Sequence, residues 1–378
     1  MKPKSEAELA EMVATAKAPL RIVGGGTRNI APHLGGAPLS TAGITGVSLY
    51  EPGALTLVAA AGTPVSEIDA VLANEGQRLA FEPMDHRGLL GTQGTPTIGG
   101  VVAANVSGPR RIQAGAARDS TLGVRFVDGA GRSLKNGGRV MKNVTGYDLV
   151  KLMAGSWGTL GVLSEVSLKV QAIPETAGCV LLYGLSEMDA VRALSQALGS
   201  PYDVSGAAHA PVGIDGHPVT MVRVEGLEAS VSYRTEKLKD LLADTGAEIH
   251  IERSPDRLRD GWAWVRDVAV LQGGDRNIWR FSVKPSDAPH LVAELRDKAA
   301  DIKVMYDWGG GLVWISTARD LDMRPAQLSG HATLVRASDQ IRETVPVFQP
   351  EQAPIQAISK GLRAEFDPRG ILNPGLMG

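Results

Sequence analysis

The residues of this chain that are best suited to chemistry are backbone groups exposed by glycine, together with threonine hydroxyls. Gly24-Gly25-Gly26-Thr27 forms one such segment, Thr97-Ile98-Gly99-Gly100 forms a second, and a third has a glycine at every third position from Gly155 to Gly161. Glycine lets the backbone adopt positive φ or approach a bulky group closely, so free N–H groups can face a ligand. The combination suits a polyanionic cofactor with a large planar group. Each segment taken alone is more typical of a tight turn between strands.

Local patterns predict the elements that must hold these segments in place. Ser5 and Glu8 form a capping-box pair at the start of an amphipathic helix. Hydrophobic patterns predict the flanking elements, which are strands at 20–23, 55–60, 121–127 and 162–170, a hairpin turn at 128–131 and a helix at 147–153. The small residues at 98–105 leave two interpretations open, a close approach to a ligand or a helix packed tightly on a sheet.

Beyond Pro174 the pattern changes to strands that alternate with amphipathic helices. The expected elements are strands at 179–183, 219–224, 278–283, 303–307 and 311–315, and helices at 186–198, 227–242 and 288–299. Repeats of this length predict an α+β protein in which an antiparallel sheet carries helices on one face. We expect a first domain at 1–172 with a break near residue 62, a second at 173–345, and a segment at 346–378 that returns to the first.

Composition excludes several classes of function. The net charge is −2 and no run of Lys or Arg could follow a phosphate backbone, so a nucleic-acid partner is not expected. Cys179 is the single cysteine, which excludes a disulfide framework and an iron–sulfur cluster held by this chain alone. The polar N-terminus is unlike a secretory signal, and no apolar run approaches the ~20 residues of a membrane span. A cytoplasmic protein is therefore expected.

Several segments, taken in chain order, resemble the FAD-binding domain of the vanillyl-alcohol oxidase (PCMH-type) flavoproteins. Besides the segment that opens at Thr97, these are residues 21–29, residues 142–162, and the tail at residues 366–375, which reads Phe-Asp-Pro-Arg-Gly-Ile-Leu-Asn-Pro-Gly. The resemblance spans nearly the whole chain and is strongest at its two ends. It implies a two-subdomain FAD-binding domain closed by the C-terminal tail, with the segment 173–345 as a cap or docking domain.

The same resemblance implies which residues contact FAD. They are Val23, Gly24, Gly25, Gly26, Thr27, Arg28, Asn29, Pro83, Gly94, Thr95, Thr97, Ile98, Gly99, Gly100, Asn105, Thr145, Tyr147, Gly158, Thr159, Gly161, Val162 and Asn373. The histidine that covalent relatives use after the glycine loop is not matched, since Thr27-Arg28 occupy that region, so the FAD is expected to be non-covalent. Asn29 takes the third glycine position of the dinucleotide fingerprint, which disfavours a nicotinamide cofactor.

Within this family the chain resembles the smaller of the two flavoprotein-like subunits of bacterial glycolate oxidases. That resemblance implies a subunit that takes part in oxidising glycolate to glyoxylate, with electrons passing through flavin to an iron–sulfur partner. The expected partners are a larger flavoprotein subunit and an iron–sulfur subunit, and only through them would the chain reach the inner face of a membrane. Two alternatives stay open, a self-sufficient FAD-dependent 2-hydroxyacid dehydrogenase and a non-catalytic structural subunit.

Oxidation of a 2-hydroxy acid needs a cation for the carboxylate and a base for the hydroxyl proton. Arg280 lies between two aromatic residues on an alternating strand and is our candidate cation, with Arg223 as a second. A solvent-facing arginine is the alternative for either. His331 is the candidate base, although a single histidine near a strand more often has a structural role.

The larger subunit and its dehydrogenase relatives carry a histidine-rich, metal-binding substrate motif of the kind Gly-Glu-His-Gly in the cap. This sequence lacks it, which argues against independent 2-hydroxyacid oxidation by the chain. His209 and His217 are spaced without a carboxylate partner and are a weak metal signal, so no metal is expected.

Overall fold

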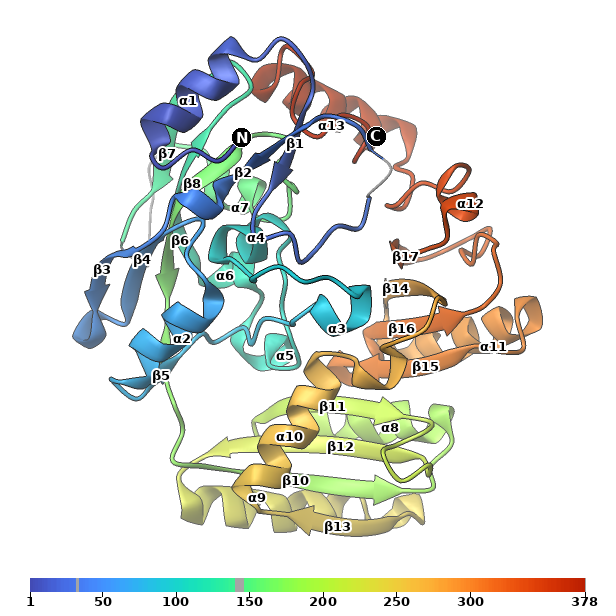
Figure 1. Cartoon of the computed structure of the whole chain (residues 1–378). Coiled ribbons are helices and arrows are strands. Elements are labelled where there is room, and N and C mark those ends of the chain that lie inside the picture. Colours follow the sequence, from blue (N-terminus) through green and yellow to red (C-terminus); the bar gives the residue numbers. More distant parts are fainter. Residues whose placement is uncertain (32–33, 140–145, 378) are drawn as a thin grey trace.

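Two antiparallel sheets form the frame of the molecule in the computed structural model, which describes residues 1–31, 34–139 and 146–377 (Figure 1). The first sheet has five strands, in the order β3 (Val47–Glu51), β4 (Thr56–Ala60), β8 (Val162–Lys169), β6 (Thr121–Val127) and β7 (Ser133–Gly137). Two small pairs accompany it, β1 (Leu20–Val23) parallel to β2 (Ala37–Ser40), and β5 (Gln77–Arg78) with β9 (Gln171–Ala172). The predicted strand at 121–127, the hairpin formed by its turn at 128–131, and the buried strands β4 and β8 are therefore present.

Short helices surround this sheet. They are α1 (Glu6–Thr15), α2 (Val65–Ala73), α3 (Arg87–Leu90), α4 (Ile98–Ala103), α5 (Arg111–Ala114), α6 (Ala117–Ser120) and α7 (Leu149–Met153). Helix α1 begins at the predicted pair, because the Ser5 side chain accepts a hydrogen bond from the Glu8 N–H. Its buried face is Leu9 and Val13. Just before α2, the Thr63 hydroxyl donates to the Ala60 carbonyl at 2.7 Å.

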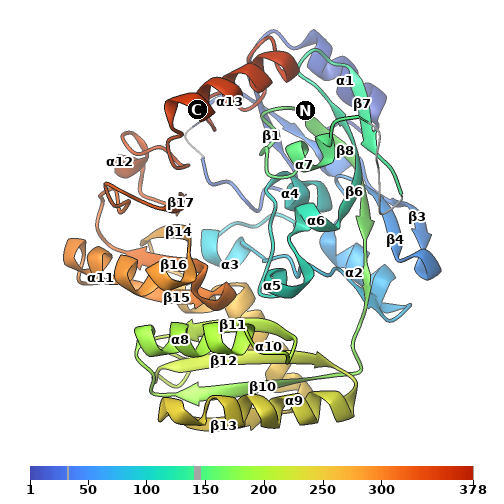
Figure 2. The same ribbon diagram turned by 180° about the vertical axis from the view of Figure 1, so that it is seen from behind.

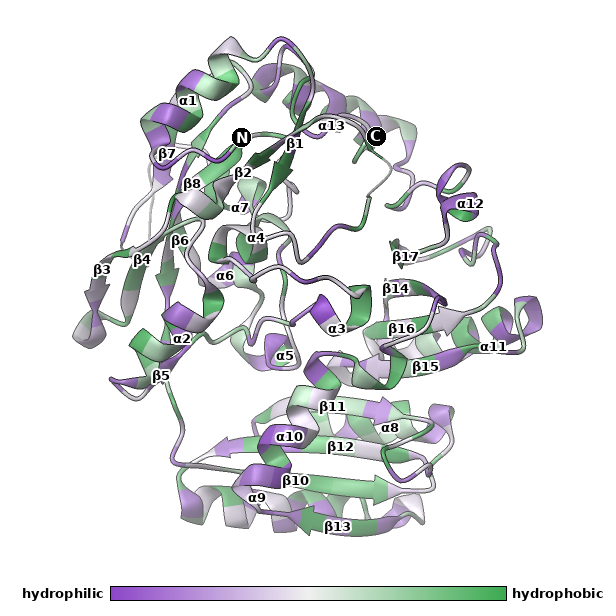
Figure 3. Ribbon diagram, viewed as in Figure 1, coloured by the Kyte–Doolittle hydropathy of each residue, from purple (hydrophilic) through white to green (hydrophobic). Residues whose placement is uncertain are grey.

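The second sheet has eight strands, five of which the sequence predicted. Their order is β13 (Glu248–Glu252), β10 (Thr176–Tyr183), β12 (Val219–Gly226), β11 (Val204–Ala210), β15 (Lys303–Asp307), β16 (Leu312–Thr317), β14 (Asn277–Val283) and β17 (Gly330–Arg336). Strand β11 lies at the centre and all of its residues are buried. Strand β10, next to the edge of this sheet, is mainly hydrophobic (Figure 3).

Helices cover both faces of this sheet, which corrects the expectation of helices on one face. Helices α8 (Glu187–Leu198), α9 (Glu228–Leu241) and α11 (Ala288–Lys298) lie on one face, and α10 (Pro255–Arg266) crosses the other (Figures 1 and 2). The physical reason is that the second face is also apolar: Trp262 of α10 lies against Gly206, where a Cβ would approach its ring to 2.7 Å. That face looks toward the first domain, and α5 contacts β11.

The C-terminal segment returns to the first domain through α12 (Asp339–Arg342) and α13 (Ala353–Phe366). The Leu20 N–H donates to the Ile371 carbonyl at 2.7 Å, and the Asn373 N–H donates to the Leu20 carbonyl at 2.9 Å. The Arg369 guanidinium reaches the Gly129 carbonyl of the hairpin turn at 2.7 Å. The segment 371–373 thus lies beside β1, and Met1 lies beside β2, where its amine donates to the Pro38 carbonyl at 2.6 Å. No helix in the described ranges has the length and apolar character that crossing a bilayer requires.

Candidate functional site

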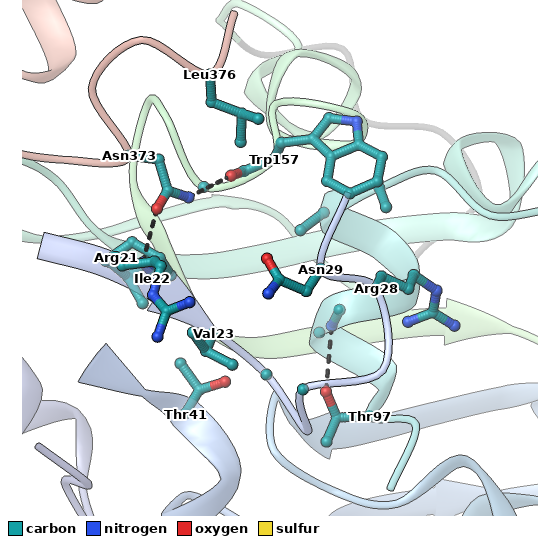
Figure 4. Close-up of a pocket in the computed structure, with 18 of the residues that line it drawn as sticks. Arg21, Ile22, Val23, Arg28, Asn29, Thr41, Thr97, Trp157, Asn373 and Leu376 are labelled. Atoms are coloured by element: carbon teal, nitrogen blue, oxygen red, sulfur yellow. Dashed lines mark hydrogen bonds between the residues drawn. The ribbon is translucent and has the colours of Figure 1, made fainter. Parts of the chain in front are cut away.

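The loop that follows β1 forms one wall of a cavity of about 330 Å³ (Figure 4). Two backbone carbonyls of this loop accept hydrogen bonds from neighbouring side chains. The Gly24 carbonyl accepts from the Ser40 hydroxyl at 3.0 Å, and the Thr27 carbonyl accepts from the Thr92 hydroxyl at 3.1 Å. Among the described residues, no hydrogen bond has as its donor the backbone N–H of Gly25, Gly26, Thr27, Arg28 or Asn29. A row of free amides at a cavity wall forms a nest for anions.

Glycine is required in this loop because a second loop crosses it at contact distance. A Cβ on Gly25 would lie 1.6 Å from the Thr95 carbonyl oxygen, and a Cβ on Gly94 would lie 1.7 Å from the Gly25 carbonyl oxygen. The Thr95 N–H donates to the Gly25 carbonyl at 3.2 Å, which holds the two loops together. The glycines therefore fix the shape of the nest, and the side chains of Arg21 and Arg28 add positive charge to the same cavity (Figure 4).

Helix α4 forms the floor of this cavity. Its N-cap is Thr97, whose side chain accepts from the Gly100 N–H. Gly99 packs on the end of β4, where a Cβ would lie 2.6 Å from the Ala61 side chain, while Gly100 lines the cavity. The tight packing of this small-residue helix on the sheet is therefore confirmed at Gly99, and the close approach to a ligand stays a prediction for Gly100.

The tail and the loop at 155–161 close the remaining side. The Asn373 side chain accepts from the Ile22 N–H at 2.7 Å and donates to the Trp157 carbonyl at 2.8 Å (Figure 4). Asn373 has φ 43, a left-handed conformation that asparagine tolerates better than most residues. One side chain therefore joins β1, the Trp157 loop and the chain terminus around the cavity.

A second cavity, of about 250 Å³, lies where the first domain meets the eight-stranded sheet. Ile30, Ala104 and Trp157 line both cavities, so the two adjoin. The second contains ionisable side chains from both domains, which are His86, Arg111, Arg266, Arg280 and Asp307.

Two arginines of the second cavity lie over the ring of Trp308. The Cζ of Arg111 lies 4.5 Å from the ring centroid and that of Arg280 lies 5.2 Å from it. No described hydrogen bond or ion pair engages either guanidinium. Burial, and then repulsion by Arg111, lower the pKa of Arg280 to about 10, so it stays charged at neutral pH. Two partly buried guanidiniums without a hydrogen-bonding partner among the described residues favour an anionic ligand, although Asp307 offsets part of the charge of Arg280.

Two other groups of this cavity have strongly shifted pKa values. His86 Nδ1 accepts from Arg28 Nε at 3.3 Å, and burial followed by the charge of Arg28 lowers the pKa of His86 to about 3. Burial raises the pKa of Asp307 to about 7. Strongly perturbed groups gathered in a cavity are typical of functional sites.

The residues at 1–137 match the family model described as an FAD binding domain. Over 339 residues the chain is 35% identical to glycolate oxidase subunit GlcE of Escherichia coli K12, covering 88% of this chain and 84% of that one. The chain belongs to the glycolate oxidase subunit GlcE family. This GlcE-family chain is also 24% identical to glycolate oxidase subunit GlcD of Bacillus subtilis 168, over 83% of this chain and 73% of that one.

Solved structures agree on the fold. The VAO-type flavoprotein MtVAO615 of Myceliophthora thermophila C1 superposes with a TM-score of 0.64 at 14% identity, covering 97% of this chain and 76% of that one. The α+β fold with its large antiparallel sheet is therefore that of the vanillyl-alcohol oxidase (PCMH-type) flavoproteins, as the sequence predicted. The GlcE-family chain therefore belongs to a family of FAD-linked oxidoreductases, which are flavoproteins.

Most of the residues predicted to contact FAD in this GlcE-family chain line the first cavity. They are Val23, Gly24, Gly25, Gly26, Thr27, Arg28, Asn29, Thr97, Gly99, Gly100, Gly158, Gly161, Val162 and Asn373. Asn105 lines the second cavity instead, and Pro83 and Thr95 line a cleft between the two domains.

The other predicted contacts lie elsewhere. Gly94 packs against Gly25 of the nest, and Ile98 is buried in the core. The Thr159 hydroxyl donates a hydrogen bond to the Ser156 carbonyl at 2.7 Å. Tyr147 is 88% exposed, so its ring lies on the surface. Thr145 lies outside the described residues.

The structure separates the candidate catalytic residues. Arg280 lines the second cavity, whereas His331 is exposed on β17, paired with Ser282, and lines neither cavity. Sequence reasoning missed His86, Arg111 and Asp307. They come from three distant segments, and the one local signal was the Gly309-Gly310 turn that presents Asp307.

Arg223, the second candidate cation, is occupied by a buried ion-pair cluster between the domains. Its guanidinium donates to Glu82 at 3.0 and 3.2 Å and lies over the Trp262 ring at 4.3 Å. In the same cluster, the Glu225 carboxylate forms ion pairs with the guanidiniums of Arg78 at 2.8 Å and Arg110 at 2.9 Å. Arg223 therefore joins the domains and has no free donor face for a substrate.

Proposed function

We propose that the first cavity binds FAD non-covalently. The observation that carries this proposal is the row of free amides at residues 25–29, flanked by Arg21 and Arg28, which matches the two charges of a pyrophosphate. Thr97, Gly100, Gly158 and Asn373 would surround the rest of the cofactor. The FAD domain would comprise 1–172, divided near residue 62, and would be closed by 346–378.

We further propose that this chain is the FAD-binding subunit of a glycolate oxidase or dehydrogenase complex and takes part in oxidising a small 2-hydroxy acid, glycolate to glyoxylate. Its family membership and its likeness to glycolate oxidase subunit GlcD support this proposal. The partners would be a larger flavoprotein subunit and an iron–sulfur subunit, because one cysteine cannot hold a cluster. The segment 173–345 would be the cap.

The second cavity supports the substrate class. Bound FAD would accept a hydride from the substrate's α-carbon. Arg280 and Arg111 would hold the carboxylate, because both guanidiniums face the cavity without another hydrogen-bonding partner among the described residues. Trp157 and Trp314 would exclude water from the same space. His331 would have to move from its exposed position on β17 to act there as a base.

The test is a visible spectrum of the purified chain, followed by anaerobic addition of glycolate and of D-lactate. A flavin band that stays oxidised until the partner subunits are added supports the complex. A band that bleaches with substrate alone supports the self-sufficient dehydrogenase. The absence of any band, even after FAD is added, would refute the cofactor proposal and leave the structural subunit.

A further inference from the structure

The second cavity needs a group that accepts a proton if a hydroxyl is oxidised there. Of the described side chains that line it, His86 and Asp307 are the ones with a basic site. The other ionisable lining residues are the arginines Arg111, Arg266 and Arg280, which stay protonated. The choice therefore lies between an imidazole and a carboxylate.

The imidazole is unsuited to the role. Because His86 Nδ1 accepts the Arg28 N–H, its lone pair is engaged and its proton must be on Nε2. Burial and the nearby Arg28 charge oppose a second proton, and the pKa of His86 is lowered to about 3. His86 is thus a neutral group that can donate a hydrogen bond at physiological pH.

The carboxylate of Asp307 has an available oxygen. Asp307 ends β15, and one of its oxygens accepts from the Trp308 N–H at 2.7 Å. No other described hydrogen bond reaches this carboxylate, although Asp307 is only 4% exposed. The turn is held against the first domain, because Trp308 Nε1 donates to the Gly108 carbonyl at 3.0 Å.

The charges around Asp307 come from both domains. They are Arg280 on β14, Arg223 on β12, Arg111 on α5 and Glu82 in the loop after β5. Burial is the largest influence and raises the pKa of Asp307 to about 7; Glu82 adds to the rise, while the Trp308 N–H, Arg223 and Arg280 oppose it. A base is most effective when its pKa lies near the working pH.

We propose that Asp307 is the proton acceptor of the second cavity and takes the hydroxyl proton of a small 2-hydroxy acid held by Arg280 and Arg111. This inference rests on the proposed function, which supplies flavin as the oxidant. The hydroxyl proton would pass to the Asp307 carboxylate, and bound flavin would supply the oxidant for the α-hydrogen, which would leave with its bonding electron pair. The C–O bond becomes C=O, so two electrons and two hydrogens leave the substrate.

A binding measurement tests the placement of Asp307 without turnover. Oxalate, which lacks an oxidisable hydroxyl, is titrated into the full chain while the fluorescence of the cavity tryptophans is followed. Ionised Asp307 repels the dianion, so oxalate affinity falls as pH rises through about 7. We expect binding about tenfold weaker at pH ~8.5 than at pH ~6 for the wild type. Asp307→Asn should remove this dependence, and the exposed control Asp240→Asn should keep it. The same pH dependence in Asp307→Asn overturns the proposal.

Anaerobic bleaching of the FAD-loaded chain, with its partner subunits where needed, tests the proton transfer. Asp307→Asn should keep the flavin spectrum and slow bleaching by glycolate by about a hundredfold or more. His331→Gln tests the alternative base. Slower bleaching in His331→Gln, together with a normal rate in Asp307→Asn, overturns the role of Asp307. So does a wild-type flavin that neither glycolate nor D-lactate bleaches. A chain without flavin defeats the proposed function instead, and the oxalate measurement still stands.

Discussion

Replacing Glu225 with glutamine should weaken the contact between the eight-stranded sheet, which carries Glu225, and the N-terminal part of the chain, which carries Arg78 and Arg110. Glu225 lies on β12 with its side chain 7% exposed, and it accepts from Arg78 and Arg110 of the first domain at 2.8 and 2.9 Å. Three guanidiniums and two carboxylates form the cluster, which leaves a net charge of +1. The substitution raises the net charge of the cluster to +2 and leaves Glu82 as the one carboxylate that the three guanidiniums share.

The magnitude follows from burial. Removing one partner of a buried ion pair costs about 3–5 kcal/mol, because the remaining charges are left without compensation. The side chains of Arg78 and Arg110 are 20% and 15% exposed, so water screens part of the imbalance. We therefore expect the lower end, a loss of about 3 kcal/mol in the free energy of unfolding.

Equilibrium urea unfolding measures this loss, with tryptophan fluorescence as the signal because Trp262 lies 4.3 Å from the Arg223 guanidinium. The exposed Glu365→Gln is the matched control. The charges of Arg223, Arg110 and Arg78 hold the pKa of Glu225 well below its usual value of 4.5, against the opposing effect of burial. The stabilisation is therefore complete above pH ~4.5 and is lost as pH falls toward the folded-state pKa. Equal unfolding free energies for Glu225→Gln and Glu365→Gln at neutral pH would refute this account of the domain contact.

Two further substitutions test the two cavities separately. Gly25→Ala places a methyl group on the Thr95 carbonyl, so we expect a lower melting temperature and lost FAD retention by gel filtration, with a cost of about 1–3 kcal/mol or more. Gly53→Ala, where no atom lies within 4 Å of the new Cβ, should behave as the wild type. Arg280→Ala should weaken oxalate binding about 10- to 100-fold, as expected for lost charge-assisted hydrogen bonds, while the FAD spectrum stays unchanged. Unaltered oxalate affinity would remove Arg280 from the substrate site.

Local sequence patterns predicted the strand at 20–23 and the glycine loop that follows it, because the determinants of both are local. The loop at 24–29 depends on a strand, three glycines and a short return, all within a few residues. The strand pair β6–β7 depends likewise on its own turn. The sequence did not reveal why glycine is required at positions 25 and 94, since the close contact that requires it joins two loops far apart in the sequence.

The eight-stranded sheet was predicted less completely because its decisive features are not local. Strand β11 has mostly small residues without alternation, and it is buried by contacts with α8, α5 and its neighbouring strands. Helix α10 does carry a local signal, because Leu258, Trp262 and Val265 recur at helical spacing and are buried. The convergence of His86, Arg111 and Asp307 required the docking of the two domains, which no local pattern encodes.

The two cavities are coupled through shared residues rather than merely adjacent. Arg28 lines the first cavity and donates to His86 in the second, while Trp157 lines both and is held by Asn373 from the tail. A ligand that draws the Arg28 guanidinium toward the nest would weaken its bond to His86 and lessen the positive charge near Arg280. Anion affinity in the second cavity should therefore differ between the FAD-free and FAD-loaded chain, because the same guanidinium serves both sites.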